Sequence, residues 1–355
     1  DGPGLAIAWG AQGSVSDWSS LALAARDGKL AELSNQSAPE SLPFGREHPI
    51  LLAASHGHAS FLRTYETYFG KKQIIQNAQS ALSAAAANGH LSVSEHIIQS
   101  YADALLAGKQ PEQAQLMSLN VAARLGYQEI VAMLLQQLPS AMESQEQRFH
   151  VDLADSDGNT ALMLAARGGH AEIMTLLLKH GASWTVADHS GSTAWHIAST
   201  FGPVGTIEAL KFASGADAKT QVNNADFFGS NCLHVAASAG HASILASLFG
   251  VGDIASSLLQ LGGTTAAAAI VDAPGPEYVR ATPLHLAVIG GHVAACDIIL
   301  FEAGELKNQV LSALDGNGET AYSISTFFGD ERADVANYLN VQMQMLQPHR
   351  KGDEL

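Results

Sequence analysis

The stretch Leu164-Ala-Ala-Arg-Gly-Gly-His170 contains a motif that this chain repeats: small apolar residues, then a glycine, often followed by histidine. Similar motifs lie at 52–58, 84–90, 235–241 and 286–292. A motif that recurs every few dozen residues is the signature of a solenoid, in which one structural unit stacks on the next. The repetition therefore predicts a protein that is mostly shaped surface, and it favours binding over catalysis.

Nine copies of the motif appear when the chain is aligned on the glycine. These glycines are Gly28, Gly57, Gly89, Gly126, Gly169, Gly202, Gly240, Gly291 and Gly329. We expect each of them to end a short Ala-rich helix in a left-handed turn, which a residue with a Cβ resists.

A helix start is expected nine residues before each glycine, where Ser, Thr and Asn are frequent. Side-chain oxygens of these residues cap the free backbone amides of a helix. The expected starts are Ser19, His48, Ser80, Met117, Thr160, Thr193, Asn231, Thr282 and Thr320, and Pro49 and Pro283 occupy the following position. Apolar residues at helical spacing, as in 173–177, predict a second helix in each unit. Asp- and Gly-rich links such as 155–160 predict hairpin tips.

Two stretches resemble the ankyrin repeat closely. One is Thr282-Pro-Leu-His-Leu-Ala287 followed by Gly291-His292, and the other runs from Asp155 through Gly169-His170 to Ala182. The resemblance is close over about 150–250 and 280–340 and more distant over about 18–140. It implies an all-α fold: an ankyrin-repeat solenoid of stacked helix-turn-helix units with hairpin-like loops.

The spacing between glycines predicts the domain organisation. Family units run about 33 residues, whereas the step from Gly240 to Gly291 is much longer. We expect an N-terminal segment, one array, a tail and three insertions that project as loops. The respective ranges are 1–17, 18–345, 346–355, and about 102–115, 138–150 and 251–280.

Two further helices are expected outside the regular pattern. One is a short helix within the last insertion, from Asp253 to Leu261. The other runs from Ala333 to Met345 and places Val335, Leu339 and Met343 on one stripe. Because a solenoid needs a terminal unit with a polar outer face, we interpret this last helix as a cap.

Charge and composition narrow the classes of partner. The chain has 355 residues and a formal net charge of −16, which disfavours nucleic acid and anionic membranes as partners. A basic or neutral protein or peptide suits this charge better, and no apolar run reaches transmembrane length. The two cysteines, Cys232 and Cys296, are expected to be reduced core thiols. We therefore expect a cytoplasmic monomer.

The 15 histidines do not indicate a catalytic or metal site. Many of them occupy repeat positions, and the resemblance implies that those of the Thr-Pro-Leu-His type brace neighbouring hairpins. No GxSxG, P-loop or HExxH motif is present. We expect no enzymatic activity, no cofactor and no metal; an active site, if one exists, is expected within 251–280.

The resemblance implies that partners contact the hairpin tips and the exposed ends of the first helices along the concave side. The candidate residues at helix ends are Arg124, Arg167, Phe201, Phe327 and Phe328, and those at tips are Asp157, His189, Phe227, Phe228 and Tyr278. Aromatic side chains are enriched in binding hot spots, and exposed apolar clusters mark interaction sites. The alternative is that Phe201 and Phe328 pack against a neighbouring unit and that the tip aromatics pack against the 251–280 insertion.

These observations favour a non-catalytic scaffold that recognises a protein or peptide. Two alternatives stay open. One is a secreted microbial effector whose array acts on host proteins in the host cytoplasm. The other is the targeting portion of a larger enzyme.

Overall fold

A computed structural model describes residues 22–23, 25–28, 48–69, 72–97, 100, 111–137, 151–252, 255–262 and 280–346. The chain divides into two compact units, Asp1–Asp155 and Ser156–Leu355. In the described residues every regular element is a helix, and strand pairing is confined to three isolated β-bridges. The all-α solenoid prediction is thus confirmed. No helix among the described residues combines the length and the apolar character needed to cross a bilayer.

The described part of the first unit contains five helices with both ends defined. They are α2 (Pro49–Ser55), α3 (Ala59–Phe69), α4 (Lys72–Ala87), α6 (Pro111–Leu125) and α7 (Gln128–Gln137), and residues 91–97 are also helical. Helix α4 lies between α2 and α6 and contacts both. Large side chains such as Phe61, Tyr65 and Leu82 are fully buried there and form the core.

Two of the predicted helix starts in this unit are wrong. Ser80 lies inside α4, which begins at Lys72, and Met117 lies inside α6, which begins at Pro111. No glycine or proline interrupts 72–87 or 112–125, so the helical periodicity continues back past both positions. Residues 111–115, expected within an insertion, form the first turn of α6.

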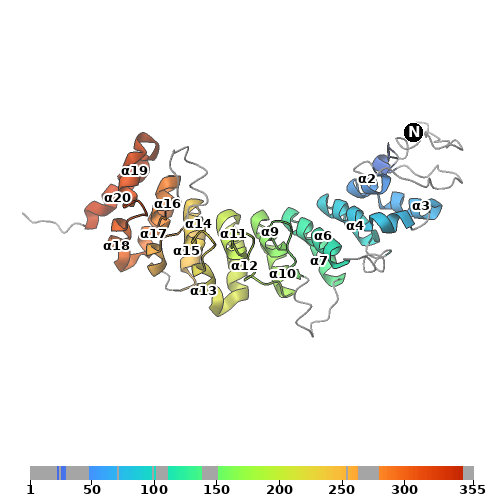
Figure 1. The fold of residues 1–355 in the computed structure, drawn as a ribbon, viewed down its shortest axis with the longest axis horizontal. Coiled ribbons are helices and arrows are strands. Elements are labelled where there is room, and N and C mark those ends of the chain that lie inside the picture. Colours follow the sequence, from blue (N-terminus) through green and yellow to red (C-terminus); the bar gives the residue numbers. More distant parts are fainter. Residues whose placement is uncertain are drawn as a thin grey trace, which may run out of the picture. The chain divides into compact units, whose positions relative to one another are not determined.

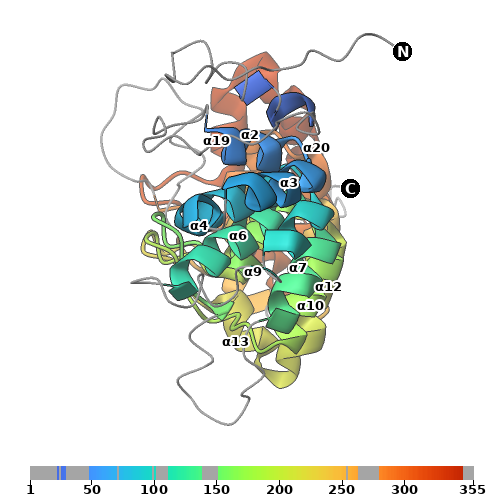
Figure 2. The same cartoon turned by 90° about the vertical axis from the view of Figure 1, so that its right-hand side faces the viewer.

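The second unit is a row of five helix pairs (Figure 1). The first helices are α9 (Ala161–Gly168), α11 (Ala194–Phe201), α14 (Cys232–Ser238), α16 (Pro283–Gly290) and α19 (Ala321–Phe327). The second helices are α10 (Ala171–Lys179), α12 (Val204–Ser214), α15 (Ala242–Phe249), α17 (Val293–Glu302) and α20 (Ala333–Leu346). Each helix contacts the corresponding helix of the next pair, so the unit has a first-helix layer and a second-helix layer. Figure 2 shows α10 and α12 one behind the other in the second-helix layer.

Short helical segments follow three of the second helices. They are η2 (Gly215–Asp217) with α13 (Ala218–Asn223), η3 (Ala255–Leu259), and η5 (Gly304–Leu306) with α18 (Lys307–Ser312). The expected helix from 253 to 261 is therefore present as the shorter 3-10 helix η3. Its buried Leu258 anchors it in the unit.

Eight of the nine motif glycines adopt the left-handed conformation, with φ between 57° and 85°. The prediction is wrong for Gly202, whose φ is −81°. Pro203 follows it, and a residue before proline is driven into the extended region. The caps follow the prediction at Thr160, whose hydroxyl accepts from the Met163 amide at 3.4 Å, and at Asn231.

The terminal helix α20 buries Val335 and Leu339, as expected for one apolar stripe. Met343 was expected on the same stripe but is 37% exposed. Met343 lies one turn beyond Leu339, past the part of α20 that contacts α19 and η6 (Gly329–Arg332).

Candidate functional site

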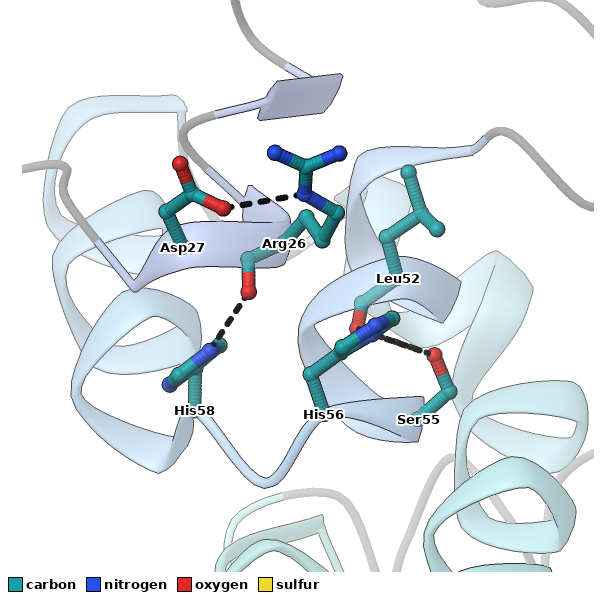
Figure 3. A network of polar contacts seen from close by, with 6 residues as sticks. All are labelled: Arg26, Asp27, Leu52, Ser55, His56 and His58. Atoms are coloured by element: carbon teal, nitrogen blue, oxygen red, sulfur yellow. Dashed lines mark hydrogen bonds and ion pairs between the residues drawn. The ribbon is translucent and has the colours of Figure 1, made fainter.

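The histidines of the Gly-His motif join successive repeats. In the first unit, Nε2 of His58 donates to the carbonyl oxygen of Arg26 at 2.7 Å (Figure 3), and His90 bonds Ser55 in the same way at 2.9 Å. In the second unit His241 reaches Thr200, and His292 reaches Ser238. Each acceptor lies two residues before the motif glycine of an earlier repeat. These histidines therefore have a structural role, in which they hold neighbouring repeats together.

Other side chains take this place where the histidine is missing. A Cβ added to Gly89 would meet the ring of Tyr127, and one added to Gly169 would meet Pro203. In the last repeat, Nε of Arg332 donates to the carbonyl oxygen of Ile289 at 3.1 Å. The contact is therefore retained although the residue type changes.

The buried histidines His196, His234 and His285 brace the hairpins, as the resemblance implies. Nδ1 of each accepts the amide of its cap residue, and Nε2 donates to a carbonyl oxygen of the following segment. Burial lowers the pKa of His196 and His285 and lowers that of His234 to about 4. All three are neutral structural groups at pH 7.

An aspartate shapes each regular hairpin tip. Oδ1 of Asp226 accepts the amides of Phe228 and Ser230, both at 2.9 Å. Asp188 and Asp315 do the same in their own turns. Each tip is thereby a hydrogen-bonded turn, in which residues such as His189 and Phe227 are exposed while Ser230 is buried.

Backbone hydrogen bonds link the tips into a row. The His189 amide donates to the carbonyl oxygen of Asp157 at 3.4 Å, and the Phe227 amide donates to that of Ser190 at 3.0 Å. A Cβ on Gly191 would lie 2.7 Å from the ring of Phe227, so Phe227 packs over the preceding tip. His189 lies in the same way over Gly158.

The long insertion enters the chain at the fourth tip of this row. Gly262 and Ala281 exchange two backbone hydrogen bonds, of 2.9 and 3.0 Å. They lie at the position where, in the next tip, the Asp315 amide donates to the carbonyl oxygen of Glu319. The Arg280 carbonyl oxygen then accepts the amide of Gly316 on the next tip at 2.7 Å. Of the range 251–280 expected as the insertion, residues 255–262 therefore belong to the regular architecture.

The structure exposes most of the predicted partner-binding residues. Phe201 is 54% exposed, Phe227 78%, Phe228 37% and Phe327 87%. Arg124, Arg167, Asp157 and His189 are also exposed, and Phe328 is half-buried. Tyr278 lies outside the described residues. The binding roles themselves stay a prediction.

Two pairs of these residues come together. The Arg167 guanidinium lies over the Phe201 ring at 5.4 Å from its centroid, joining the ends of α9 and α11. Phe328 packs edge-on against Phe327 at 6.0 Å and lies under the guanidinium of Arg332. Phe201 therefore packs on an arginine of the neighbouring repeat while staying exposed, as the alternative interpretation allowed in part, and the half-buried Phe328 packs on residues of its own repeat. The two pairs are separated along the first-helix layer by α14 and α16.

Sequence reasoning missed two exposed aromatics on the other layer. Phe212 is 87% exposed and Phe301 is 76% exposed, near the ends of α12 and α17. Each lies three residues before a glycine with positive φ, Gly215 or Gly304. The matching Phe-x-x-Gly pattern was the available signal.

The described residues contain no group of three or more His, Cys, Asp and Glu side chains placed to hold a metal ion. Cys232 and Cys296 are buried and have no disulfide partner. Burial raises the pKa of both thiols to about 12. Neither thiol is therefore poised as a nucleophile.

Paired helices, left-handed glycines, hairpin tips and histidine ties define this chain as a helical-repeat protein. A family model described as "Ankyrin repeats (3 copies)" matches residues 119–222. This match and the repeated architecture support the assignment of the chain as an ankyrin repeat protein. Ankyrin repeats indicate a protein–protein interaction domain.

Three curated relatives illustrate the similarity. A "Transient receptor potential cation channel subfamily A member 1 homolog" from Caenorhabditis elegans is 27% identical over 184 residues, which is 52% of this chain and 13% of that protein. "NF-kappa-B inhibitor delta" from Mus musculus is 34% identical over 95 residues, 27% of this chain and 28% of the relative. "Probable E3 ubiquitin-protein ligase XBOS32" from Oryza sativa is 26% identical over 176 residues, 46% and 34% respectively. The chain thus spans about a third or less of each relative.

Proposed function

We propose that this protein is a non-catalytic recognition scaffold that binds a protein or peptide through the second unit. The binding surface is formed by the ends of the first helices and by the hairpin tips. Arg167, Phe201 and Phe227 are its main contact residues.

The observation that carries the proposal is the exposure of Phe201 and Phe227 on rigidly held backbone. The Phe227 amide is hydrogen-bonded to the preceding tip, and the Phe201 ring lies under Arg167. Exposed aromatic side chains on ordered backbone lose little conformational entropy on binding. Rigid tips therefore favour these positions as anchors for a partner.

The test is affinity capture from a lysate of the source organism, with bound proteins quantified by mass spectrometry. A Phe201→Ser/Phe227→Ser variant is compared with the wild-type chain and with Phe212→Ser/Phe301→Ser. The second variant removes two aromatics of the second-helix layer that are 87% and 76% exposed, against 54% and 78% for Phe201 and Phe227, so it controls for nonspecific hydrophobic adsorption.

We expect specific partners to be lost with Phe201→Ser/Phe227→Ser and retained with the control. Loss of the same partners with the control alone would place the interface on the second-helix layer. Equal capture by all three proteins would overturn the proposed surface.

A second candidate is that this array is the targeting portion of a larger enzyme. It is supported by the minor share of each relative that the match covers and by the ligase named among them. An immunoblot of the native protein with an antibody raised against this chain tests the idea. A band near the 37.1 kDa of this chain would exclude the candidate.

A further inference from the structure

The first-helix layer of the second unit differs in charge from the rest of the chain. Helices α9, α11, α14, α16 and α19 contain no Asp or Glu, and Arg167 is their one charged residue. The second-helix layer carries Glu172, Glu208, Asp297, Glu302 and Asp334 together with Lys179 and Lys211, so that acidic residues are in excess. The net negative charge of the chain therefore does not describe the first helices, whereas the hairpin tips beside them carry acidic residues such as Asp157 and Glu319.

Arg167 is held in a fixed position at this surface. Its Nη2 donates to Oδ1 of the buried Asn159 at 3.4 Å, and its guanidinium lies over the Phe201 ring. No carboxylate in the described part of the chain forms an ion pair with it. The guanidinium still has donors available, and a planar guanidinium binds carboxylates in a bidentate manner.

The acidic residues of the neighbouring hairpins are already used by the fold. Oδ1 of Asp188 and of Asp226 accepts the amides of its own turn, and Asp226 is buried. Asp157 is exposed, but it lies at a hairpin tip rather than at the end of a first helix. The positive charge beside Phe201 thus faces a surface without acidic side chains of its own layer.

The residues that follow along the layer are small. Ser238 and Ala239, at the end of α14, hold the positions that Thr200 and Phe201 hold at the end of α11. The exposed Phe201 ring is thus followed, at the next helix end, by the small half-buried side chains of Ser238 and Ala239. The layer therefore combines one cation with adjoining apolar surface.

We propose that this layer binds a peptide segment in which a carboxylate lies next to one or two apolar residues. The carboxylate binds Arg167, and the apolar side chains pack on Phe201 and Ala239. This inference rests on the proposed function and gives the partner's chemistry: an acidic apolar segment, although the net charge alone favours a basic or neutral partner.

The test is selection of random 12-residue peptides by phage display against the full chain, followed by affinity measurement with the best synthetic peptide. We expect Asp or Glu beside Leu, Ile, Val or Phe to be enriched. Arg167→Gln should weaken binding about tenfold or more, because a charge-assisted hydrogen bond is lost. Arg167→Lys should restore only part of the affinity, since the ammonium lacks the bidentate fork. Phe212→Ala should bind as the wild type does.

A double-mutant cycle isolates the contact. Replacing the peptide carboxylate with its amide should weaken binding to the wild type by the same factor, and should have no further effect on Arg167→Gln. Circular dichroism confirms that each variant, changed at an exposed position, remains folded.

The outcomes separate this inference from the proposed function. The inference is overturned if the selected peptides are rich in Lys and Arg, or if Arg167→Gln does not change their affinity. The proposed surface is still supported in that case if Phe201→Ala weakens their binding. Peptides whose affinity depends on neither Phe201 nor Phe227 overturn both. Failure to select any peptide also counts against both.

Discussion

The imidazole ring of His292 packs directly over Gly240 of the preceding repeat. A Cβ added to Gly240 would lie 2.5 Å from Nδ1 of His292. Nε2 of the same ring donates to the carbonyl oxygen of Ser238 at 3.1 Å, and the φ angle of Gly240 is 73°. The Gly-His motif is therefore a contact between repeats, in which the glycine of one unit makes room for the histidine of the next.

Replacing Gly240 should test both its left-handed backbone conformation and its contact with the His292 ring. Gly240→Ala forces a Cβ into the left-handed region, which costs about 1–2 kcal/mol, and also displaces the His292 ring. We expect the free energy of unfolding in urea to fall by about 3 kcal/mol or more.

Gly181→Ala is the matched control. Gly181 has a φ of 87°, yet nothing lies within 4 Å of its missing Cβ, so the variant should lose only the backbone contribution of about 1–2 kcal/mol. Equal losses in the two variants would show that the His292 contact adds nothing.

Buried histidines make the protein sensitive to acid. Burial lowers the pKa of His234 from its ordinary value of 6.5 to about 4 in the folded state, and burial also lowers the pKa values of His196 and His285. The unfolded chain takes up protons first as the pH falls. The contribution of these neutral histidines to the free energy of unfolding is therefore fully present above about pH 6.5 and is lost as the pH falls from 6.5 to 4. His234 alone accounts for about 3 kcal/mol of it.

Urea unfolding at pH 7.5, 6.5, 5.5 and 5.0 measures this dependence. His234→Gln should flatten the slope, while His189→Gln, at an exposed tip, should leave it as in the wild type. A wild-type free energy of unfolding that is constant or rising from pH 6.5 to 5.0 would be incompatible with the buried neutral histidines.

The sequence predicted the second unit well because its repeats carry complete local signals. The caps at Thr160 and Asn231 and the left-handed turns at Gly169 and Gly291 were all identified from their own residues. Gly202 departs because Pro203 restricts its backbone, and the starts of α4 and α6 were missed because no cap residue marks them.

The candidate surface was only partly predictable. The repeat position of Phe227 at a hairpin tip favoured its exposure, whereas for Phe201 packing against a neighbouring unit was an open alternative. The pairing of Arg167 with Phe201 depends on how two repeats stack. The entry point of the insertion, between Gly262 and Ala281, is defined by backbone hydrogen bonds that leave no side-chain signature.

The pairing of Gly262 with Ala281 predicts that residues 263–280 can be deleted without disrupting the fold. The Gly262 amide donates to the carbonyl oxygen of Ala281 as the Asp188 amide donates to that of Ser192, and the latter pair is joined by the three residues 189–191. Replacing 263–280 with His-Ser-Gly should therefore close a regular tip. The loop shortens from 18 residues to 3, so loop-closure entropy should stabilise the protein by about 1–2 kcal/mol.

Thermal unfolding measures this change as a rise of the midpoint by a few degrees. Replacing 189–191 with Gly-Gly-Gly is a suitable comparison, because it changes a tip without changing loop length. A lower midpoint or a broadened transition in the shortened chain would show that residues 263–280 contribute stabilising contacts.

Arg332 should hold the last helix pair in place. Its Nε donates to the Ile289 carbonyl oxygen at 3.1 Å, and its guanidinium lies 5.7 Å from the centroid of the Phe328 ring. Arg332→Ala should cost about 1–2 kcal/mol. Because each repeat of a solenoid is stabilised by its neighbours, amide hydrogen exchange should accelerate in α19 and α20 but not in α9 and α10. Lys179→Ala, an exposed change at the end of α10, should leave exchange in α19 and α20 unaltered. A uniform acceleration across the unit with Arg332→Ala would mean that the five pairs open as one cooperative body.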